Sequence, residues 1–231
     1  MEQLTQNAIK RALGEQAATF VEDGMLVGLG TGSTSAFFID SLIKRCQSGL
    51  KITAVATSAR SQEQARQGGI PIYDTDRISE LDLTIDGADE IDPRNRMIKG
   101  GGGALVREKI LASSSKKMLA IVDESKLVDV LGKFGLPIEI VPFCYLAALT
   151  KIRKLGYDGK MRYLPDGSHY RTDNGNLIFD VHTPLTFSSP EESHERLACL
   201  PGVVDTGFFF NLPVQVLVGY KSGRVALRES L

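Results

Sequence analysis

The chain has 231 residues, of which 42% are hydrophobic and 24% are charged, and its net charge is −1 at pH 7. This length can bury a real core and fits one large domain or one domain carrying a smaller second one. The near-neutral balance gives no overall field that would attract nucleic acid or a membrane surface. Three widely spaced cysteines without a CxxC pair argue against a disulfide framework and a zinc site. With a polar N-terminus and no apolar run near the roughly 20 residues of a membrane helix, we expect no signal peptide and a cytoplasmic protein.

The first half of the chain alternates short apolar runs with amphipathic segments. Apolar residues recur at helical spacing over residues 3–22, which predicts an amphipathic helix. Ser58 is a good N-cap for a later helix. The other expected segments are strands at 25–29, 52–56, 70–73, 81–85 and 118–122, and helices at 35–46, 59–67 and 104–112. Strands that alternate with helices predict βαβ units and a mainly parallel, Rossmann-like α/β sheet.

The pattern changes near Gly132, where GKFGLPIEIVPF carries two prolines and is typical of a domain junction. Turns rich in Pro, Asp, Asn and Gly separate the segments that follow. These segments are strands expected at 138–141, 161–163, 177–181 and 203–210, and helices at 143–155 and 191–199. A last strand at 214–219 should return to the first domain. We therefore expect an α/β domain formed by residues 1–135 and 209–231, and a smaller α+β domain over 136–208.

A glycine-rich loop from Gly28 to Thr34 lies between the first expected strand and the next helix. Backbone N–H groups at such a turn, the helix N-terminus and the Thr and Ser hydroxyls can hold a phosphate. The loop departs from a dinucleotide fingerprint, because Ser33 stands at the third glycine and no acidic residue closes the second strand. No Gly-Lys-Ser/Thr follows, so it is not a P-loop. The loop favours phosphate without a nucleotide, and a tight turn without a ligand is the alternative.

Asp86 and Asp89 lie three residues apart where the strand at 81–85 ends. Ligands bind at the carboxyl edge of open α/β sheets, which places Asp86 at a candidate site. Two carboxylates this close repel, so one of them could keep its proton, and the pair could exchange protons with sugar hydroxyls. The acidic cluster also suits Ca²⁺ or Mg²⁺, although its spacing does not match an EF-hand loop. A solvated acidic turn is the third alternative, and this motif alone leaves all three open.

Lys99 is followed by four glycines, Gly100 to Gly103, which carry a heavy entropic cost. Such a run suits a place where backbone approaches a ligand, and Lys99 beside it could stabilise negative charge developing on oxygen. The alternative is a flexible surface loop.

Glu108 is an acidic residue with apolar neighbours on the helical wheel, which suits a general base. A salt bridge to a nearby cation is the alternative, and it would be preferred for this residue alone. Lys126 follows the strand at 118–122 at the same predicted sheet edge, where it could meet substrate oxygens. The three histidines show no partner pattern that suggests a site.

Taken together, these motifs are more specific than any one of them. GLGTGST, TSARS, DGADEID, KGGGGALVREK, VDESKLV and GKFGLPIEI occur in this order. The series resembles ribose-5-phosphate isomerases of the A type over nearly the whole chain, and most strongly over residues 25–142. Gly135 departs from the family pattern, because it stands where a proline is expected, and this concerns local loop shape rather than chemistry.

The resemblance implies interconversion of D-ribose 5-phosphate and D-ribulose 5-phosphate in the pentose phosphate pathway, with no organic cofactor and no metal. Glu108 falls on the family's catalytic base, Asp86 and Asp89 on its acidic pair, and Lys99 on its active-site lysine. The positions that fall on substrate contacts are Thr31, Gly32, Ser33, Thr34, Asp86, Gly87, Ala88, Asp89, Lys99, Gly100, Gly101, Gly102 and Lys126. Lys10, in the first helix, is a further candidate for the phosphate.

The resemblance also implies an α/β domain with an inserted, smaller α+β domain of ferredoxin-like type, assembled as homodimers or homotetramers. The expected partner is a small sugar phosphate rather than nucleic acid or a membrane. Two other functions are considered: a phosphosugar-sensing module that is not an enzyme, and a related sugar-phosphate or acyl-CoA enzyme on a similar sheet. The joint presence of Asp86, Asp89, Lys99 and Glu108 favours the isomerase.

Overall fold

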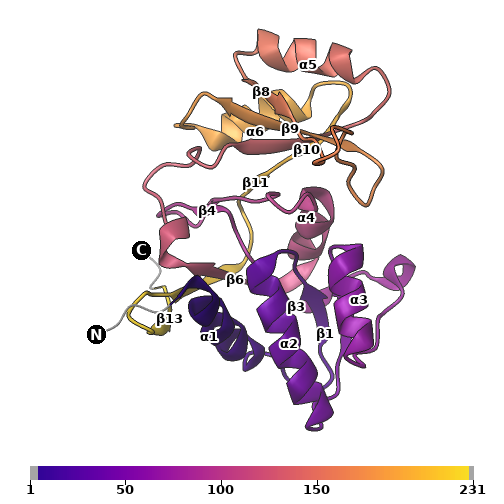
Figure 1. Cartoon of the computed structure of the whole chain (residues 1–231), viewed down its shortest axis with the longest axis vertical. Helices are drawn as coiled ribbons and strands as arrows, with labels where there is room; N and C mark the ends of the chain where they lie inside the picture. Colours follow the sequence, from indigo (N-terminus) through magenta and orange to yellow (C-terminus); the bar gives the residue numbers. More distant parts are fainter. Residues whose placement is uncertain (1–4, 229–231) are drawn as a thin grey trace. The chain divides into compact units, whose positions relative to one another are not determined.

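The structure is a computed structural model that describes residues 5–228 (Figure 1). The chain divides into two compact units. One unit comprises the chain up to Ala88, Arg107–Leu127 and the chain from Leu212 onward, and the other comprises Asp89–Val106 and Val128–Asn211. No helix of the described part is long and apolar enough to cross a membrane.

The first unit is built on a six-stranded sheet with the order β13-β12-β6-β3-β1-β2. Its strands are β1 (Leu26–Leu29), β2 (Thr53–Ala56), β3 (Leu81–Asp86), β6 (Ser115–Asp123), β12 (Val214–Gly219) and β13 (Val225–Leu227). All neighbouring strands run parallel except the β12–β13 pair. The predicted parallel sheet is therefore confirmed. Because parallel strands end at one edge, the residues that follow β1, β3 and β6 share that edge.

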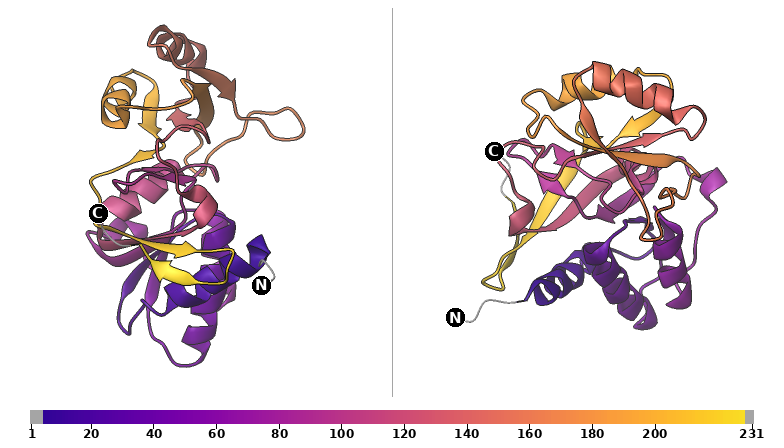
Figure 2. Two further views of the ribbon diagram at one scale, coloured as in Figure 1. Left: turned by 90° about the vertical axis from the view of Figure 1, so that its left-hand side faces the viewer. Right: turned by 45° about the horizontal axis from the view of Figure 1, so that its top comes forward.

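Three helices accompany the sheet, α1 (Gln6–Ala18), α2 (Ser33–Gln47) and α3 (Ala59–Gln67), and α1 and α2 lie side by side (Figures 1 and 2). Their apolar residues, such as Leu13 and Phe38, join Val27 and Leu29 of β1 in the main core. The helix α4 (Leu105–Ser113) covers the other face, where Leu111 packs with Val55 and Leu81. Hydrophobic packing on both faces explains why the strands read as continuous apolar runs.

The second unit contains a four-stranded antiparallel sheet with the order β10-β7-β9-β8. The elements follow one another as β7 (Leu136–Ile140), α5 (Tyr145–Lys154), β8 (Asp158–Met161), β9 (Leu177–Thr183), α6 (Pro190–Ala198) and β10 (Val203–Thr206). This βαββαβ succession is the ferredoxin-like arrangement. A second core, which includes Ile138 and Phe179, lies between the sheet and its helices.

A three-stranded sheet, ordered β11-β5-β4, also belongs to the second unit. It consists of β4 (Glu90–Ile91), β5 (Met97–Ile98) and β11 (Phe208–Phe209). Because β5 pairs with β11, residues 89–106 fall in this unit, whereas the sequence placed them in the α/β domain. The strand expected at 203–210 is broken at Gly207, where an added Cβ would lie 2.4 Å from the Lys99 carbonyl oxygen. The chain passes there from one sheet to the other.

Other boundaries differ from the sequence prediction for local reasons. The strand expected at 161–163 is β8, which ends at Met161, and the one at 70–73 is a single bridge between Ile72 and Ala54. The first helix starts at Gln6, capped by Thr5, and residues 3 and 4 of the predicted helix lie outside the described residues. Gly135 has φ +95°, a value closed to proline, so the loop before β7 takes a shape of its own.

Candidate functional site

The loop after β1 brings together backbone N–H groups and hydroxyls in the first unit. The Thr31 hydroxyl lies 2.6 Å from the Thr57 hydroxyl and donates to Ser58 Oγ at 2.8 Å. Gly32 precedes α2 at φ +113° and supplies no side-chain cap, so the N–H groups of the first turn face outward from the helix end. Lys10 Nζ donates to Ser33 Oγ at 2.8 Å. A helix N-terminus, hydroxyls and an ammonium group at one place suit an anion.

Asp86 ends β3 and is buried, with 1% of its surface exposed. Its Oδ1 accepts hydrogen bonds from Thr31 N–H at 3.0 Å, from the Ser35 hydroxyl at 3.1 Å and from Gly87 N–H at 2.7 Å. An added Cβ on Gly30 would lie 2.0 Å from the same oxygen. The loop after β1 (residues 30–34, called the anion loop below) therefore packs directly against the Asp86 carboxylate. Glycine is required at position 30 for this close approach.

Glu108 and Lys126 are the other candidates of the first unit. Glu108 lies on α4 and is 3% exposed. Lys126 is partly buried in the short 3₁₀ helix η2 (Glu124–Lys126), which follows β6 and is capped by Asp123. Since β3 and β6 are parallel neighbours, η2 follows the sheet edge at which Asp86 lies. The structure thus places Asp86 and the Lys126 segment at the predicted edge.

Asp89 and Lys99 belong to the second unit. Asp89 Oδ2 accepts the Gly101 N–H at 2.8 Å, and the Asp89 N–H donates to the Ile98 carbonyl at 2.9 Å. Lys99 is 2% exposed, and its Nζ lies 5.4 Å from the centroid of the Phe209 ring. A buried lysine over an aromatic face is held by cation–π attraction, which limits its freedom. The two units are joined in this region by the Ala88–Asp89 and Val106–Arg107 peptide bonds.

The glycine run is fixed by residues that the sequence analysis did not single out. Arg162 Nη1 donates to the carbonyl oxygens of Gly100 and Gly101, both at 3.1 Å. The Tyr170 hydroxyl donates to the Gly102 carbonyl at 3.2 Å. These contacts argue against the flexible surface loop that the sequence left open. No local signal could have found them, because Arg162 lies 61 residues after Gly101.

The remaining acids of DGADEID have structural partners in the second unit. Glu90 accepts the N–H groups of Gly132 and Phe134, both at 2.6 Å, and so shapes the loop before β7. Asp92 accepts from Arg96 Nε at 2.6 Å. No group of three or more His, Cys, Asp or Glu side chains that could hold a metal ion occurs within residues 5–228.

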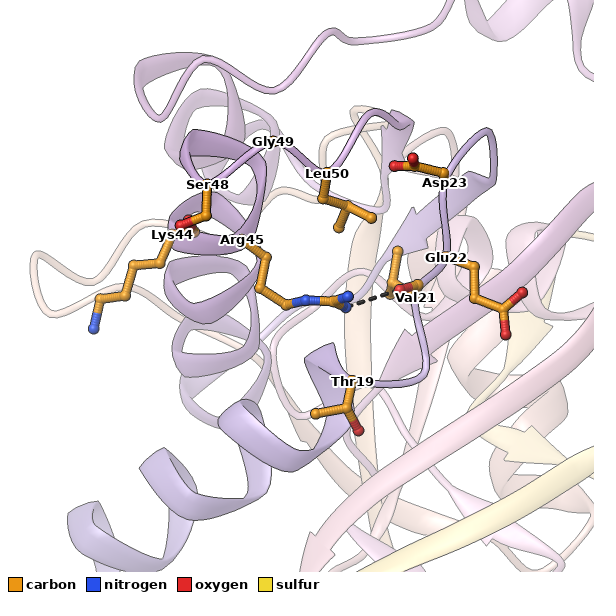
Figure 3. A pocket seen from close by; sticks show the side chains of 9 residues that line it. All are labelled: Thr19, Val21, Glu22, Asp23, Lys44, Arg45, Ser48, Gly49 and Leu50. Atoms are coloured by element: carbon orange, nitrogen blue, oxygen red, sulfur yellow. Dashed lines mark hydrogen bonds between the residues drawn. The ribbon is translucent and has the colours of Figure 1, made fainter.

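An open hollow near the start of β1 is a separate feature (Figure 3). It is lined by Thr19, Val21, Glu22, Asp23, Lys44, Arg45, Ser48, Gly49 and Leu50. Arg45 donates to the carbonyls of Ala18 and, at 2.8 Å, Val21, so its guanidinium serves the end of α1. The hollow lies before β1 and after α2, at the sheet edge opposite the anion loop. None of the predicted site residues lines it.

The fold and these groups define a class of protein. A mainly parallel α/β sheet carries at its carboxyl edge a loop of N–H groups and hydroxyls that suits an anion, with buried carboxylates and a buried lysine among the candidate groups. Such groups are typical of enzymes that move protons on a phosphorylated small molecule.

Comparison with known proteins is more specific. The family model for ribose 5-phosphate isomerase A (phosphoriboisomerase A) matches residues 53–223. Ribose-5-phosphate isomerase A of Protochlamydia amoebophila (strain UWE25) is 56% identical over 93% of this chain and 92% of its own length. Ribose 5-phosphate isomerase from Plasmodium falciparum has a TM-score of 0.93 at 36% identity, covering 97% of this chain and 99% of that one. A solved D-ribose-5-phosphate isomerase in complex with phospho-erythronic acid has a TM-score of 0.92 at 35% identity, covering 98% and 100%. The chain belongs to the ribose-5-phosphate isomerase A family.

Proposed function

We propose that this chain interconverts D-ribose 5-phosphate and D-ribulose 5-phosphate through an enediolate, in the non-oxidative branch of the pentose phosphate pathway. One observation carries the proposal: the chain belongs to this family and buries three ionisable residues, Asp86, Lys99 and Glu108, that are each 3% exposed or less. Burying such groups is costly, which favours a chemical role. No comparison supports the alternative of a sensing module without activity.

The acidic pair opens the sugar ring. Asp86 and Asp89 take the proton of the ring hydroxyl and protonate the ring oxygen, which releases the open aldose. Asp86 is held by three donors on one oxygen, and Asp89 is tied to the glycine run through Gly101 N–H. Both carboxylates are thus fixed in place, as proton transfer requires.

Glu108 moves the proton between carbons. It removes the proton from C2 of the open aldose, and the electrons of the C2–H bond pass into the enediolate. A proton passes from O2 to O1 of the enediolate, and Glu108 then delivers its proton to C1 as the C2 carbonyl forms, so one base serves both carbons. Lys99 and N–H groups of the glycine run stabilise the oxyanion that forms. In that run Gly101 N–H is taken by Asp89, and Gly102 N–H has no hydrogen-bond acceptor among residues 5–228. We assign the oxyanion contact to Gly102.

The phosphate occupies the loop after β1 in this proposal. Thr31, Gly32, Ser33 and Thr34 offer N–H groups and hydroxyls, and Lys10 adds a positive charge through its contact with Ser33. Lys126, which follows β6, meets further substrate oxygens. The substrate contacts proposed in addition are Gly87, Ala88, Gly100 and Gly101.

The proposal is tested by incubating the purified protein with ribose 5-phosphate and EDTA and measuring ribulose 5-phosphate. We expect conversion at the same rate with and without the chelator. A protein that gives no ketose in either case would refute the isomerase. Activity that EDTA abolishes would instead support the metal interpretation of the acidic cluster.

We also propose that the chain forms a homodimer or homotetramer through the small α+β domain, taken as residues 136–208. This segment exposes large apolar side chains, among them Phe143 (83%), Leu185 (72%) and Leu146 (63%). Exposed apolar residues gathered on one unit are typical of an association surface. Light scattering should give a mass at least twice 25.1 kDa, and Phe143→Asp should reduce it. A monomer at all concentrations would refute the assembly.

A cytoplasmic location stays a prediction from the sequence.

A further inference from the structure

We propose that Arg162, held by Asp180 and assisted by Tyr170, is a positioning residue that fixes the glycine run so that Gly102 N–H is aimed at the developing oxyanion. This inference deepens the proposed function and rests on it. The three side chains and the glycines all belong to the second unit.

All three nitrogens of the Arg162 guanidinium donate hydrogen bonds. Nε donates to Asp180 Oδ2 at 2.9 Å and Nη2 to Asp180 Oδ1 at 2.5 Å, a two-point contact that fixes the plane of the group. Nη1 then reaches two carbonyls at once, those of Gly100 and Gly101. The Tyr170 ring lies against the guanidinium, with 5.7 Å between its centroid and Arg162 Cζ. The side chains of Arg162 and Asp180 are only 17% and 23% exposed, so water screens this contact weakly.

Fixing a carbonyl fixes the next amide. In a trans peptide the C=O of one residue and the N–H of the next point in opposite directions. The only cis peptide within residues 5–228 is Thr183–Pro184, so the peptides of the glycine run are trans. The bond to Gly100 O therefore orients Gly101 N–H, which meets Asp89 Oδ2. The bond to Gly101 O orients Gly102 N–H, the donor assigned above to the oxyanion.

The four glycines need these contacts with Arg162 and Tyr170 to hold one backbone conformation. Glycine has the widest choice of backbone conformations, and four in succession would otherwise spread over many orientations. Donors assist a reaction best when they are already aimed, because no free energy is then lost in reorienting them. A positive charge on the carbonyl side also polarises each peptide and strengthens its N–H as a donor. Three carbonyls in a row are held here, two by Arg162 and one by Tyr170.

The experiment compares Arg162→Gln with Arg171→Gln. Arg171 is a matched control, since its Nη1 also donates to a glycine carbonyl, that of Gly175, at 3.0 Å. We expect Arg162→Gln to lower kcat by about 10- to 100-fold, less than the loss of an oxyanion donor itself, with KM changed by less than about threefold. Phospho-erythronic acid, whose carboxylate can occupy the oxyanion position, should inhibit this variant more weakly by a factor close to the loss in kcat/KM. Arg171→Gln should keep wild-type values.

Two further variants test the roles of Tyr170 and of the guanidinium group separately. Tyr170→Phe removes one donor and should lower kcat a few-fold, and guanidinium ion should partly restore the kcat of Arg162→Gly. A wild-type kcat and inhibition constant for Arg162→Gln would overturn the inference. So would a loss that Arg171→Gln shares equally, or one confined to KM. A wild-type protein that binds phospho-erythronic acid but makes no ketose would overturn the proposed function instead.

Discussion

At the scale of single residues, Asp86 and Asp89 differ in what holds them, although only two residues separate them in the chain. Asp86 is fixed by the anion loop and by Ser35 of α2, whereas Asp89 is fixed by the glycine run. The sequence predicted both as candidates, because their place after an apolar run needs no tertiary information. Arg162 and Tyr170 could not be predicted, since their role depends on contacts more than 60 residues away along the chain.

The variant Glu108→Gln tests the assignment of Glu108 as the base. The amide keeps the size of the side chain but cannot take the C2 proton, so we expect kcat to fall by at least about 10³-fold. Binding of ribose 5-phosphate, measured by calorimetry, should stay within a few-fold of wild type. Glu63→Gln, at an exposed site on α3, serves as the control and should have normal activity. A Glu108→Gln variant that turns over normally would refute the assignment of the base.

At the scale of elements, strand ends were predicted better than strand pairing. The sequence located the ends of β1, β3 and β6 because long apolar runs stop there at glycine or aspartate. The two-residue strands β4 and β5 could not be found, because such short segments have no periodicity, and β11 was expected only as the end of one strand at 203–210. Their pairing is what assigns Lys99 and the glycine run to the second unit.

The contact between α1 and α2 yields a stability prediction. A Cβ on Gly14 would lie 2.6 Å from the backbone of Phe37 and Phe38. Alanine gains about 0.5–1 kcal/mol of helix propensity over glycine, but forcing the helices apart costs about 1–3 kcal/mol. Gly14→Ala should therefore lower the free energy of unfolding in urea by roughly 1–2 kcal/mol. The neighbouring exposed Glu15→Ala should change it by less than about 0.5 kcal/mol, and an equal or stabilising effect of Gly14→Ala would contradict the close approach.

Asp82 of β3 accepts hydrogen bonds from residues of β1 and β6, and its ionisation makes the stability of the fold depend on pH. The hydrogen bond from Lys116, at 2.8 Å, and that from Leu26 N–H, at 2.9 Å, lower the pKa of Asp82. Its charged form thus stabilises the fold above the ordinary aspartate pKa of about 3.9, and this is lost as the pH falls through the lower folded-state value. Asp82→Asn should lower Tm at pH 7 by about 1–3 °C. The difference from wild type should shrink toward acid pH, and a difference that stays constant to the lowest pH at which both proteins are folded would contradict the linkage.

At the scale of the whole molecule, the alternation of elements predicted an α/β unit and a smaller α+β unit, and the family resemblance implied that the smaller one is ferredoxin-like. The boundary between the two was predicted less well. The sequence suggested one insertion at 136–208, whereas the second unit also takes in residues 89–106 and 128–135. Residues 89–106 belong there because β5 pairs with β11, and residues 128–135 because Val128 N–H donates to the Ile91 carbonyl and Glu90 accepts from Gly132 and Phe134. No local sequence pattern indicates these contacts. The chain therefore distributes its candidate groups, with Asp86 and Glu108 in one unit and Asp89 and Lys99 in the other.

The central claim is that a carboxylate carries the substrate proton through an enediolate. The most direct measurement follows the conversion of ribose 5-phosphate in deuterium oxide by NMR. A proton held on Glu108 exchanges with solvent while the enediolate persists. We predict that ribulose 5-phosphate acquires deuterium at C1 and that recovered ribose 5-phosphate acquires it at C2. Equilibration of the two sugars through many turnovers with no solvent deuterium at either carbon would contradict a proton that is carried through the enediolate on an exchangeable carboxyl group.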